Sequence, residues 1–159
     1  MYLKRATVLL LVLVIALGSF AVIGHSQEAK TTNIKFWHAM GGWRVDFIKR
    51  MVEDFNLLHP NIEVEVSYKG SYRETLTATI TANRAGNPPH VIQSFDIGTK
   101  ENIDSGIFAP AEELVDKFGI EVPWDDYIDP ALNYYKVEDK LYSFPWNSSN
   151  PILYANKDK

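Results

Sequence analysis

The sequence predicts an α/β fold with a largely parallel sheet flanked by helices. Three short strand-like segments alternate with two amphipathic helical segments between residues 34 and 95. In the middle strand, Ile62, Val64 and Val66 alternate with polar residues, which is the pattern of a half-buried strand. Pro60 and the Gly86–Pro89 stretch end the helical segments. This order of strand, helix, strand, helix and strand is typical of a parallel sheet.

The first half of the chain provides the first two strands. We expect a strand at 34–37, a glycine-containing loop at 38–42 and a helix from about Trp43 to the residues before Pro60. Apolar residues recur at spacings of three and four along this helix and predict its buried face: Val45, Ile48, Val52, Phe55 and Leu58. The strand at 62–66 follows.

The next helix is predicted from a capping motif. Ser71 with Glu74 three residues later forms a capping box, which opens a helix that extends to about Arg84. Its predicted inward positions are Leu76, Thr77, Ile80 and Arg84.

Shorter elements are expected after this helix. The pattern predicts a strand at 91–95, helices at 100–105 and 111–118, and a short helix or turn with a second helix within 124–135. A hairpin should turn at Glu138-Asp139, and the apolar run 152–154 resembles a strand.

The N-terminus has the form of a secretory signal. Lys4 and Arg5 precede the apolar run 6–17, and Gly24-His25-Ser26 offers a cleavage site. The alternative is an uncleaved membrane anchor. We therefore expect a signal peptide at 1–26, a flexible leader at 27–33 and a folded α/β region at 34–159.

Export and charge limit the possible classes of function. The chain has no cysteine, which excludes disulfides and a lipid-modified N-terminal cysteine, so we expect a periplasmic protein that is not a lipoprotein. Cleavage would remove Lys4 and Arg5, which lowers the net charge from −4 by two, to −6. An acidic chain without basic clusters is a poor partner for nucleic acid.

A loop rich in hydroxyls and amides is the first candidate binding element. Asn147, Ser148 and Ser149 follow Trp146 between two prolines, which make the loop rigid. Hydroxyl and amide groups beside an indole suit a polyol or a sugar. The alternative is a turn whose side chains cap their own backbone.

Further candidates follow the ends of the predicted strands, where ligands bind in parallel sheets. They are Trp37 and His38, Tyr72 after the Gly70 turn, and Asp96. The Asp96 carboxylate can hold two neighbouring hydroxyls or cap the following helix. Tyr72 begins a helix, whose free N–H groups attract an anion, or packs as a buried ring. Trp37 and Trp146 can belong to the core, and His38 can be structural.

Catalytic and metal sites are not indicated. The pairs Glu112-Glu113 and Asp125-Asp126 supply acids, but adjacent residues point in different directions, so we expect solvated faces. The chain has no nucleophile elbow and no phosphate-binding loop, and its four histidines lack the spacing of metal ligands. We expect no enzyme activity, no metal and no cofactor.

Several short strings together resemble a known family. They are Phe36-Trp37-His38-Ala39-Met40, Tyr68-Lys69-Gly70-Ser71-Tyr72, Arg84 to Pro89, Gly98-Thr99, and Pro145 to Pro151 with Tyr154 to Asp158. The chain resembles family 1 of the extracellular solute-binding proteins of ABC importers, and most of all its members that bind glycerol 3-phosphate. The likeness extends over about 34–158.

The resemblance implies a fold, a partner and a ligand. It implies that residues 34–159 are the N-terminal lobe of a periplasmic-binding-protein-like, two-lobed monomer, which closes by hinge motion and delivers its ligand to the ABC permease subunits. It also implies that Tyr72, Ser149 and Asp96 contact the ligand. Asp96 stands where the family would have glutamate, and one methylene fewer shortens its reach. The arginine that would grip a phosphate belongs to the second lobe, which is absent from this sequence.

The hypothesis from the sequence is therefore a substrate-binding protein for glycerol 3-phosphate or a glycerophosphodiester. A sugar or oligosaccharide receptor is the alternative within binding proteins. A secreted carbohydrate-active enzyme is the alternative from another class, and it would need an acid pair that faces the same cavity as Tyr72 and Ser149.

Overall fold

The computed structural model describes residues 31–147, 149 and 152–158. The predicted signal peptide, most of the predicted leader and Ser148 lie outside the described residues. A compact unit begins at Thr32, and it contains all the helices and strands described below.

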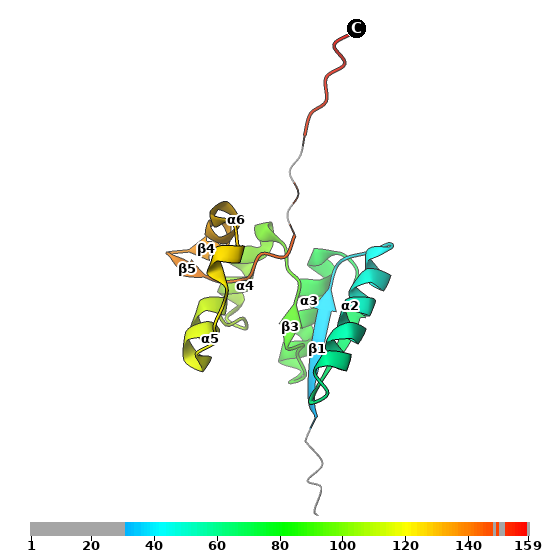
Figure 1. The fold of residues 1–159 in the computed structure, drawn as a ribbon, viewed down its shortest axis with the longest axis vertical. Helices are drawn as coiled ribbons and strands as arrows, with labels where there is room; N and C mark the ends of the chain where they lie inside the picture. The colour runs from blue at the N-terminus through cyan, green and yellow to red at the C-terminus, as the bar shows by residue number, and fades with distance from the viewer. Residues whose placement is uncertain (1–30, 148, 150–151, 159) are drawn as a thin grey trace, which may run out of the picture. The chain divides into compact units, whose positions relative to one another are not determined.

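Three parallel strands form the main sheet, in the order β2-β1-β3, and Figure 1 shows β1 and β3 side by side. They are β1 (Thr32–His38), β2 (Ile62–Tyr68) and β3 (Val91–Ile92). β1 pairs with β2 along its whole length, from Thr32 opposite Ile62 to His38 opposite Tyr68. The predicted parallel sheet is therefore confirmed. β1 begins earlier than expected, so Thr32 and Asn33 belong to the strand and not to the leader.

Two helices connect the three strands. α2 (Arg44–Leu58) joins β1 to β2, and α3 (Tyr72–Arg84) joins β2 to β3. The first connection places β2 on one side of β1, and the second passes back over β1 and places β3 on its other side. Because such crossovers are right-handed, the two helices cover opposite faces of the sheet.

The inner face of α2 is only partly as predicted. Ile48 is buried, and Val45 and Val52 are half-buried. Phe55 and Leu58 remain exposed, Leu58 to 76% of its surface. Asn56 instead ties the end of α2 to β2, because its amide donates to the Val64 carbonyl at 3.1 Å and accepts from the Val64 N–H at 2.9 Å.

The buried face of α3 differs from the prediction. Leu76 is buried as expected, but Thr77 and Arg84 are exposed, and Thr75 and Thr79 are buried instead. Buried threonines are tolerated here because each hydroxyl donates to a carbonyl one turn earlier, that of Thr75 to Ser71 at 3.0 Å and that of Thr79 to Thr75 at 2.8 Å.

The predicted capping box at the start of α3 is confirmed. The Ser71 hydroxyl accepts from the Glu74 N–H at 3.3 Å, and the Glu74 carboxylate accepts from the Ser71 N–H at 2.6 Å. Gly70 before it has φ +90°, and a Cβ at this position would collide with the Glu74 carboxylate. Glycine is therefore required both by the backbone and by the cap.

The third strand is shorter than predicted. Only Val91 and Ile92 pair with β1, opposite Phe36 and Trp37. The Gln93 N–H still donates to the Trp37 carbonyl at 2.8 Å. The chain then leaves the sheet and enters the 3-10 turn η1 (Asp96–Gly98), so the predicted strand at 93–95 is wrong.

Small elements make up the rest of the described chain. They are α4 (Thr99–Ser105), α5 (Ala111–Phe118), η2 (Trp124–Asp126), α6 (Asp129–Tyr134), β4 (Lys136–Val137) and β5 (Lys140–Leu141). Ala111 and Val115 of α5, Leu132 of α6 and Leu141 of β5 are buried.

The hairpin of β4 and β5 turns at Glu138 and Asp139, as predicted. Both residues have positive φ, 53° and 62°, as a two-residue hairpin turn of type I′ requires. The predicted strand at 152–154 is wrong. Ile152, Leu153 and Tyr154 are exposed and pair with no strand of the described chain.

Among the helices of the described residues, none is both long enough and apolar enough to cross a membrane.

Replacing Gly70 with alanine tests the role of this turn. Gly70→Ala should cost about 1–2 kcal/mol for the positive φ and a further contribution of about 1 kcal/mol because the displaced Glu74 weakens the cap. Gly86→Ala is the matched control, since Gly86 also has positive φ (+73°) but has nothing within 4 Å of its Cβ position. Urea unfolding of both variants measures the difference, and equal losses of stability would contradict this account.

Candidate functional site

The carboxyl ends of the three strands meet at one edge of the sheet. His38 ends β1, Tyr68 ends β2, and Gln93 follows β3. His38 is 1% exposed and Gln93 is 5% exposed, and both carry polar side chains. Buried polar side chains are uncommon and need hydrogen-bond partners, so this edge is where a specialised arrangement is expected.

The Gln93 amide connects three segments of the chain at this edge. Its Oε1 accepts from the Ala39 N–H at 3.1 Å, just after β1. Its Nε2 donates to the Asn147 Oδ1 at 3.2 Å and to the Tyr72 hydroxyl at 3.5 Å. The sequence did not single out Gln93, and the one signal for it is an amide directly after an apolar strand.

Tyr72 lies where the sequence predicts. Its ring stacks on Phe95, with ring centroids 5.4 Å apart and planes 17° from parallel. Its hydroxyl accepts from the Gln93 amide and donates to the Met40 sulfur at 3.8 Å. The hydroxyl is thereby held at the edge of the sheet while the ring is packed.

The loop with Trp146 and Asn147 is brought to the same edge. The Trp146 ring lies 5.4 Å from that of Phe36 in β1, and Asn147 bonds to Gln93. Trp146 keeps 47% of its surface exposed. Ser149 is also exposed, while Ser148 lies outside the described residues.

His38 belongs to an aromatic group beside this loop. Its ring is 5.9 Å from Phe36 and 5.7 Å from Tyr68, and its Nδ1 accepts from the Met40 N–H at 3.3 Å. Burial lowers the pKa of His38, so the imidazole stays neutral at pH 7. These contacts support a structural role at the edge.

Trp37 points away from this group. Successive side chains of a strand alternate between faces, so Trp37 lies on the face opposite to Phe36 and His38. The Lys69 ammonium lies 4.1 Å from the centre of its ring. The structure thus separates Trp37 from Trp146 and places a cation over it.

Asp96 accepts a hydrogen bond from a distant tyrosine. The Tyr134 hydroxyl of α6 donates to Asp96 Oδ2 at 2.7 Å, and this bond lowers the pKa of Asp96 and raises the pKa of Tyr134. Burial raises the pKa of Tyr135, and the nearby Asp96 and Tyr72 raise it further. Asp96 therefore faces an aromatic group that the sequence did not indicate, and a hydrogen bond from the Ile97 backbone lowers its pKa further.

The start of α3 is already occupied. The capping box places the Glu74 carboxylate on the Ser71 N–H, where an anion was one expectation from the sequence. A carboxylate at this position repels a second anion. The helix end therefore carries Tyr72 at the edge of the sheet and is unsuited to a second anion.

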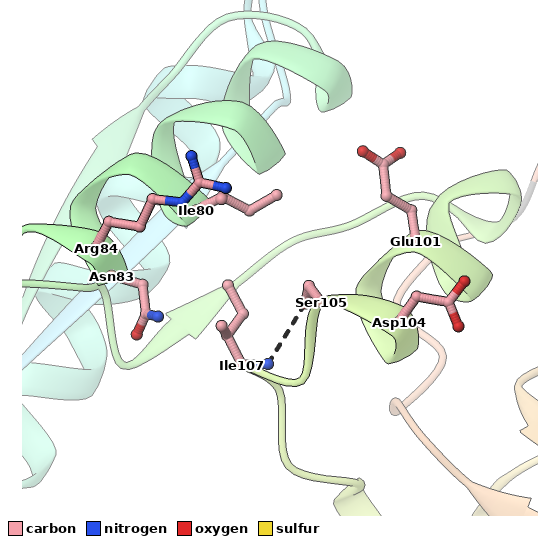
Figure 2. A pocket seen from close by; sticks show the side chains of 7 residues that line it. All are labelled: Ile80, Asn83, Arg84, Glu101, Asp104, Ser105 and Ile107. Atoms are coloured by element: carbon pink, nitrogen blue, oxygen red, sulfur yellow. Dashed lines mark hydrogen bonds between the residues drawn. The ribbon is translucent and has the colours of Figure 1, made fainter.

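An open hollow of about 460 Å³ lies elsewhere, beside the other end of α3 (Figure 2). It is lined by Ile80, Asn83, Arg84, Glu101, Asp104, Ser105 and Ile107. Arg84 is twelve residues beyond Tyr72, which is about 18 Å along the helix axis. In the hollow, Asp104 already pairs with Lys100 at 2.6 Å. None of the predicted site residues lies in this hollow.

Of the two acid pairs that a glycosidase could use, Glu112-Glu113 is engaged in the fold, and Asp125-Asp126 is exposed. Glu112 accepts from the Leu141 N–H at 2.7 Å, and Glu113 pairs with Lys140 at 2.5 Å, so both join α5 to β5. Within the part of the chain that the structure describes, no three acidic or histidine side chains are grouped as metal ligands would be.

This edge of an α/β fold sets hydroxyl, amide and carboxylate groups beside aromatic rings. Residues 41–159 match the family of bacterial extracellular solute-binding proteins, and the chain belongs to that family.

Among curated relatives, the chain is 36% identical over 147 residues to the sn-glycerol-3-phosphate-binding periplasmic protein UgpB of Rhizobium meliloti. The match covers 91% of this chain and 34% of that protein. The chain thus spans about a third of the length of the curated relatives it matches.

Solved structures support the fold class. The sugar-binding protein MalE of Xanthomonas citri superposes with a TM-score of 0.59 at 25% identity, over 72% of this chain and 28% of that one. The galacto-N-biose-/lacto-N-biose I-binding protein of the ABC transporter of Bifidobacterium longum superposes with a TM-score of 0.58 at 17% identity. This match covers 70% of this chain and 27% of that one. The α/β, periplasmic-binding-protein-like fold predicted from the sequence is confirmed.

Removing the Tyr134 hydroxyl should change the titration of Asp96. In Tyr134→Phe the carboxylate loses its donated hydrogen bond, so the pKa of Asp96 should rise toward its ordinary value. The wild-type bond stabilises the fold above the unfolded-state pKa, and this contribution is lost as the pH falls through the lower folded-state pKa. NMR titration of the Asp96 carboxyl carbon measures the pKa. Tyr127→Phe is the control, and an unchanged Asp96 pKa in Tyr134→Phe would refute the pairing.

Proposed function

We propose that this protein is the substrate-binding component of an ABC import system, capturing glycerol 3-phosphate or a glycerophosphodiester and delivering it to the membrane permease. The observation that carries the proposal is the meeting of Tyr72, Asn147 and the Asp96–Tyr134 pair around the carboxyl edge of the sheet. The name of the Rhizobium meliloti relative supports the choice of ligand.

The chemistry of this edge suits a polyol. The Asp96 carboxylate, with one oxygen bonded to Tyr134, has further lone pairs that can accept ligand hydroxyls. The exposed Ser149 hydroxyl can donate or accept. The exposed indole of Trp146 offers an apolar face for the C–H groups of a glycerol or sugar.

Binding requires the ligand to be enclosed from more than one side. The groups described here form one wall, and in a two-lobed receptor the opposite wall closes by a hinge motion. At this wall Lys69 is directed to Trp37 and the start of α3 carries Glu74, so the cation for a phosphate belongs to the opposite wall. Binding and release proceed without chemical change.

A sugar or oligosaccharide receptor is the second candidate. It is favoured by the structural neighbour from Xanthomonas citri, which is described as a sugar-binding protein. The same hydroxyl and aromatic groups can bind a neutral sugar. The charge of the opposite wall decides between a sugar and a phosphate ligand. A carbohydrate-active enzyme is less well supported, because the carboxylates of Glu112 and Glu113 accept hydrogen bonds from residues of β5.

Calorimetric titration of the full-length gene product, begun at Gln27, tests the proposal. Glycerol 3-phosphate, a glycerophosphodiester and maltose are titrated side by side. A phosphate ligand should bind, and Tyr72→Ala and Ser149→Ala should each weaken it by about tenfold or more. The exposed Ser143→Ala is the control and should leave affinity unchanged.

The other outcomes separate the candidates. Binding of maltose alone would leave the import role and remove the glycerol phosphate assignment. Cleavage of a glycan without binding of any of the three ligands would overturn the proposal in favour of an enzyme.

A further inference from the structure

Gln93 combines three properties that are rarely found together in one side chain. It is 5% exposed, its amide bonds to groups from three separate segments, and those segments all reach the candidate binding edge. Its partners lie 54, 21 and 54 residues away along the chain. The side chain is therefore placed to control how these segments meet.

The amide geometry restricts what can replace it. The Oε1 acceptor is used by the Ala39 N–H, and the Nε2 donors are used by Tyr72 and Asn147. A buried amide whose partners are all present is rigid, whereas losing it removes a partner from the half-buried Ala39 N–H and Tyr72 hydroxyl. Leucine or methionine would fill the volume but satisfy none of the three groups.

Two of the three partners are themselves candidate ligand contacts. The Tyr72 ring is fixed by Phe95, and its hydroxyl oxygen is held by the bond that it accepts from Gln93, while its O–H donates to the Met40 sulfur. Asn147 belongs to the loop that carries Trp146, whose ring packs on Phe36. The two ring contacts leave the Tyr72 hydroxyl and the Asn147 side chain free to rotate, and the hydrogen bonds to the Gln93 amide restrict this rotation.

We infer that Gln93 is a positioning residue of the binding site, which fixes the Tyr72 hydroxyl and the Asn147 loop in the geometry that receives a hydroxyl-bearing ligand. It acts through these two side chains and not by touching the ligand. The inference rests on the proposed function, since it assumes that this edge binds the ligand.

Ligand titration of Gln93→Met in the full-length protein tests the inference. Affinity for glycerol 3-phosphate should fall about tenfold, because the two contact groups lose their fixed positions. A double-mutant cycle with Tyr72→Phe and Asn147→Ala shows how Gln93 acts. In the background that lacks both partners, Gln93→Met should cause almost no further loss.

Loss of stability alone must be distinguished from loss of positioning. Val115→Ala, which opens a small cavity in α5, should lower the unfolding midpoint while the affinity stays as in wild type. If Gln93→Met does not fold, Gln93→Asn takes its place, because it keeps the amide and moves it back by one methylene.

The outcomes are separable from those of the proposed function. If wild type binds none of the ligands tested, the proposed function fails and the inference fails with it. If wild type binds and Gln93→Met binds equally well, only the inference is wrong. An equal loss in the presence and absence of the partners would show a direct contact with the ligand and would also overturn the positioning role.

Discussion

The candidate binding edge depends on the hydrogen bonds of one buried amide. Parallel strands end at the same edge of a sheet, but this alone does not order the loops that leave them. Gln93 links the end of β1, the first residue of α3 and the segment with Trp146 and Asn147 through three hydrogen bonds of 3.1 to 3.5 Å. Because its burial makes an unmade hydrogen bond costly, the amide is a strong constraint on how these segments can be arranged.

Aromatic packing complements this constraint. Phe36 lies between His38 and Trp146, and Phe95 supports Tyr72, so each ring near the edge has another ring against it. The polar ends of Tyr72 and Asn147 are held by hydrogen bonds from Gln93. Rigid rings with directed polar groups are a suitable wall for a small polar ligand, which is recognised by few, well-placed contacts.

Much of the fold could be predicted from local patterns in the sequence. The alternation in β2, the Ser71–Glu74 capping box and the turn at Glu138-Asp139 each depend on neighbouring residues, and each is found in the structure. The edge that carries the candidate site could be predicted too, because the carboxyl ends of parallel strands meet at one edge of a sheet. The run 152–154 shows the limit of such patterns, since an apolar segment becomes a strand only when another strand pairs with it.

The partners within the site could not be predicted in the same way. In the sequence, Gln93 is a polar residue like many others after a short strand. Its role depends on hydrogen bonds to Ala39 and Asn147, each 54 positions away. The Asp96–Tyr134 bond spans 38 positions. Thr75 and Thr79 are buried because α3 turns that face to the sheet, and threonine spacing alone carries no such signal.

The central claim is that the ligand binds at the carboxyl edge and not in the hollow beside Arg84. NMR mapping of backbone amides in the full-length protein, with glycerol 3-phosphate and then maltose added, tests it most directly. The account predicts that the largest shifts occur at Ala39, Tyr72, Gln93, Asp96 and Asn147. Shifts concentrated at Asn83, Arg84 and Ser105, with the edge unchanged, would contradict it.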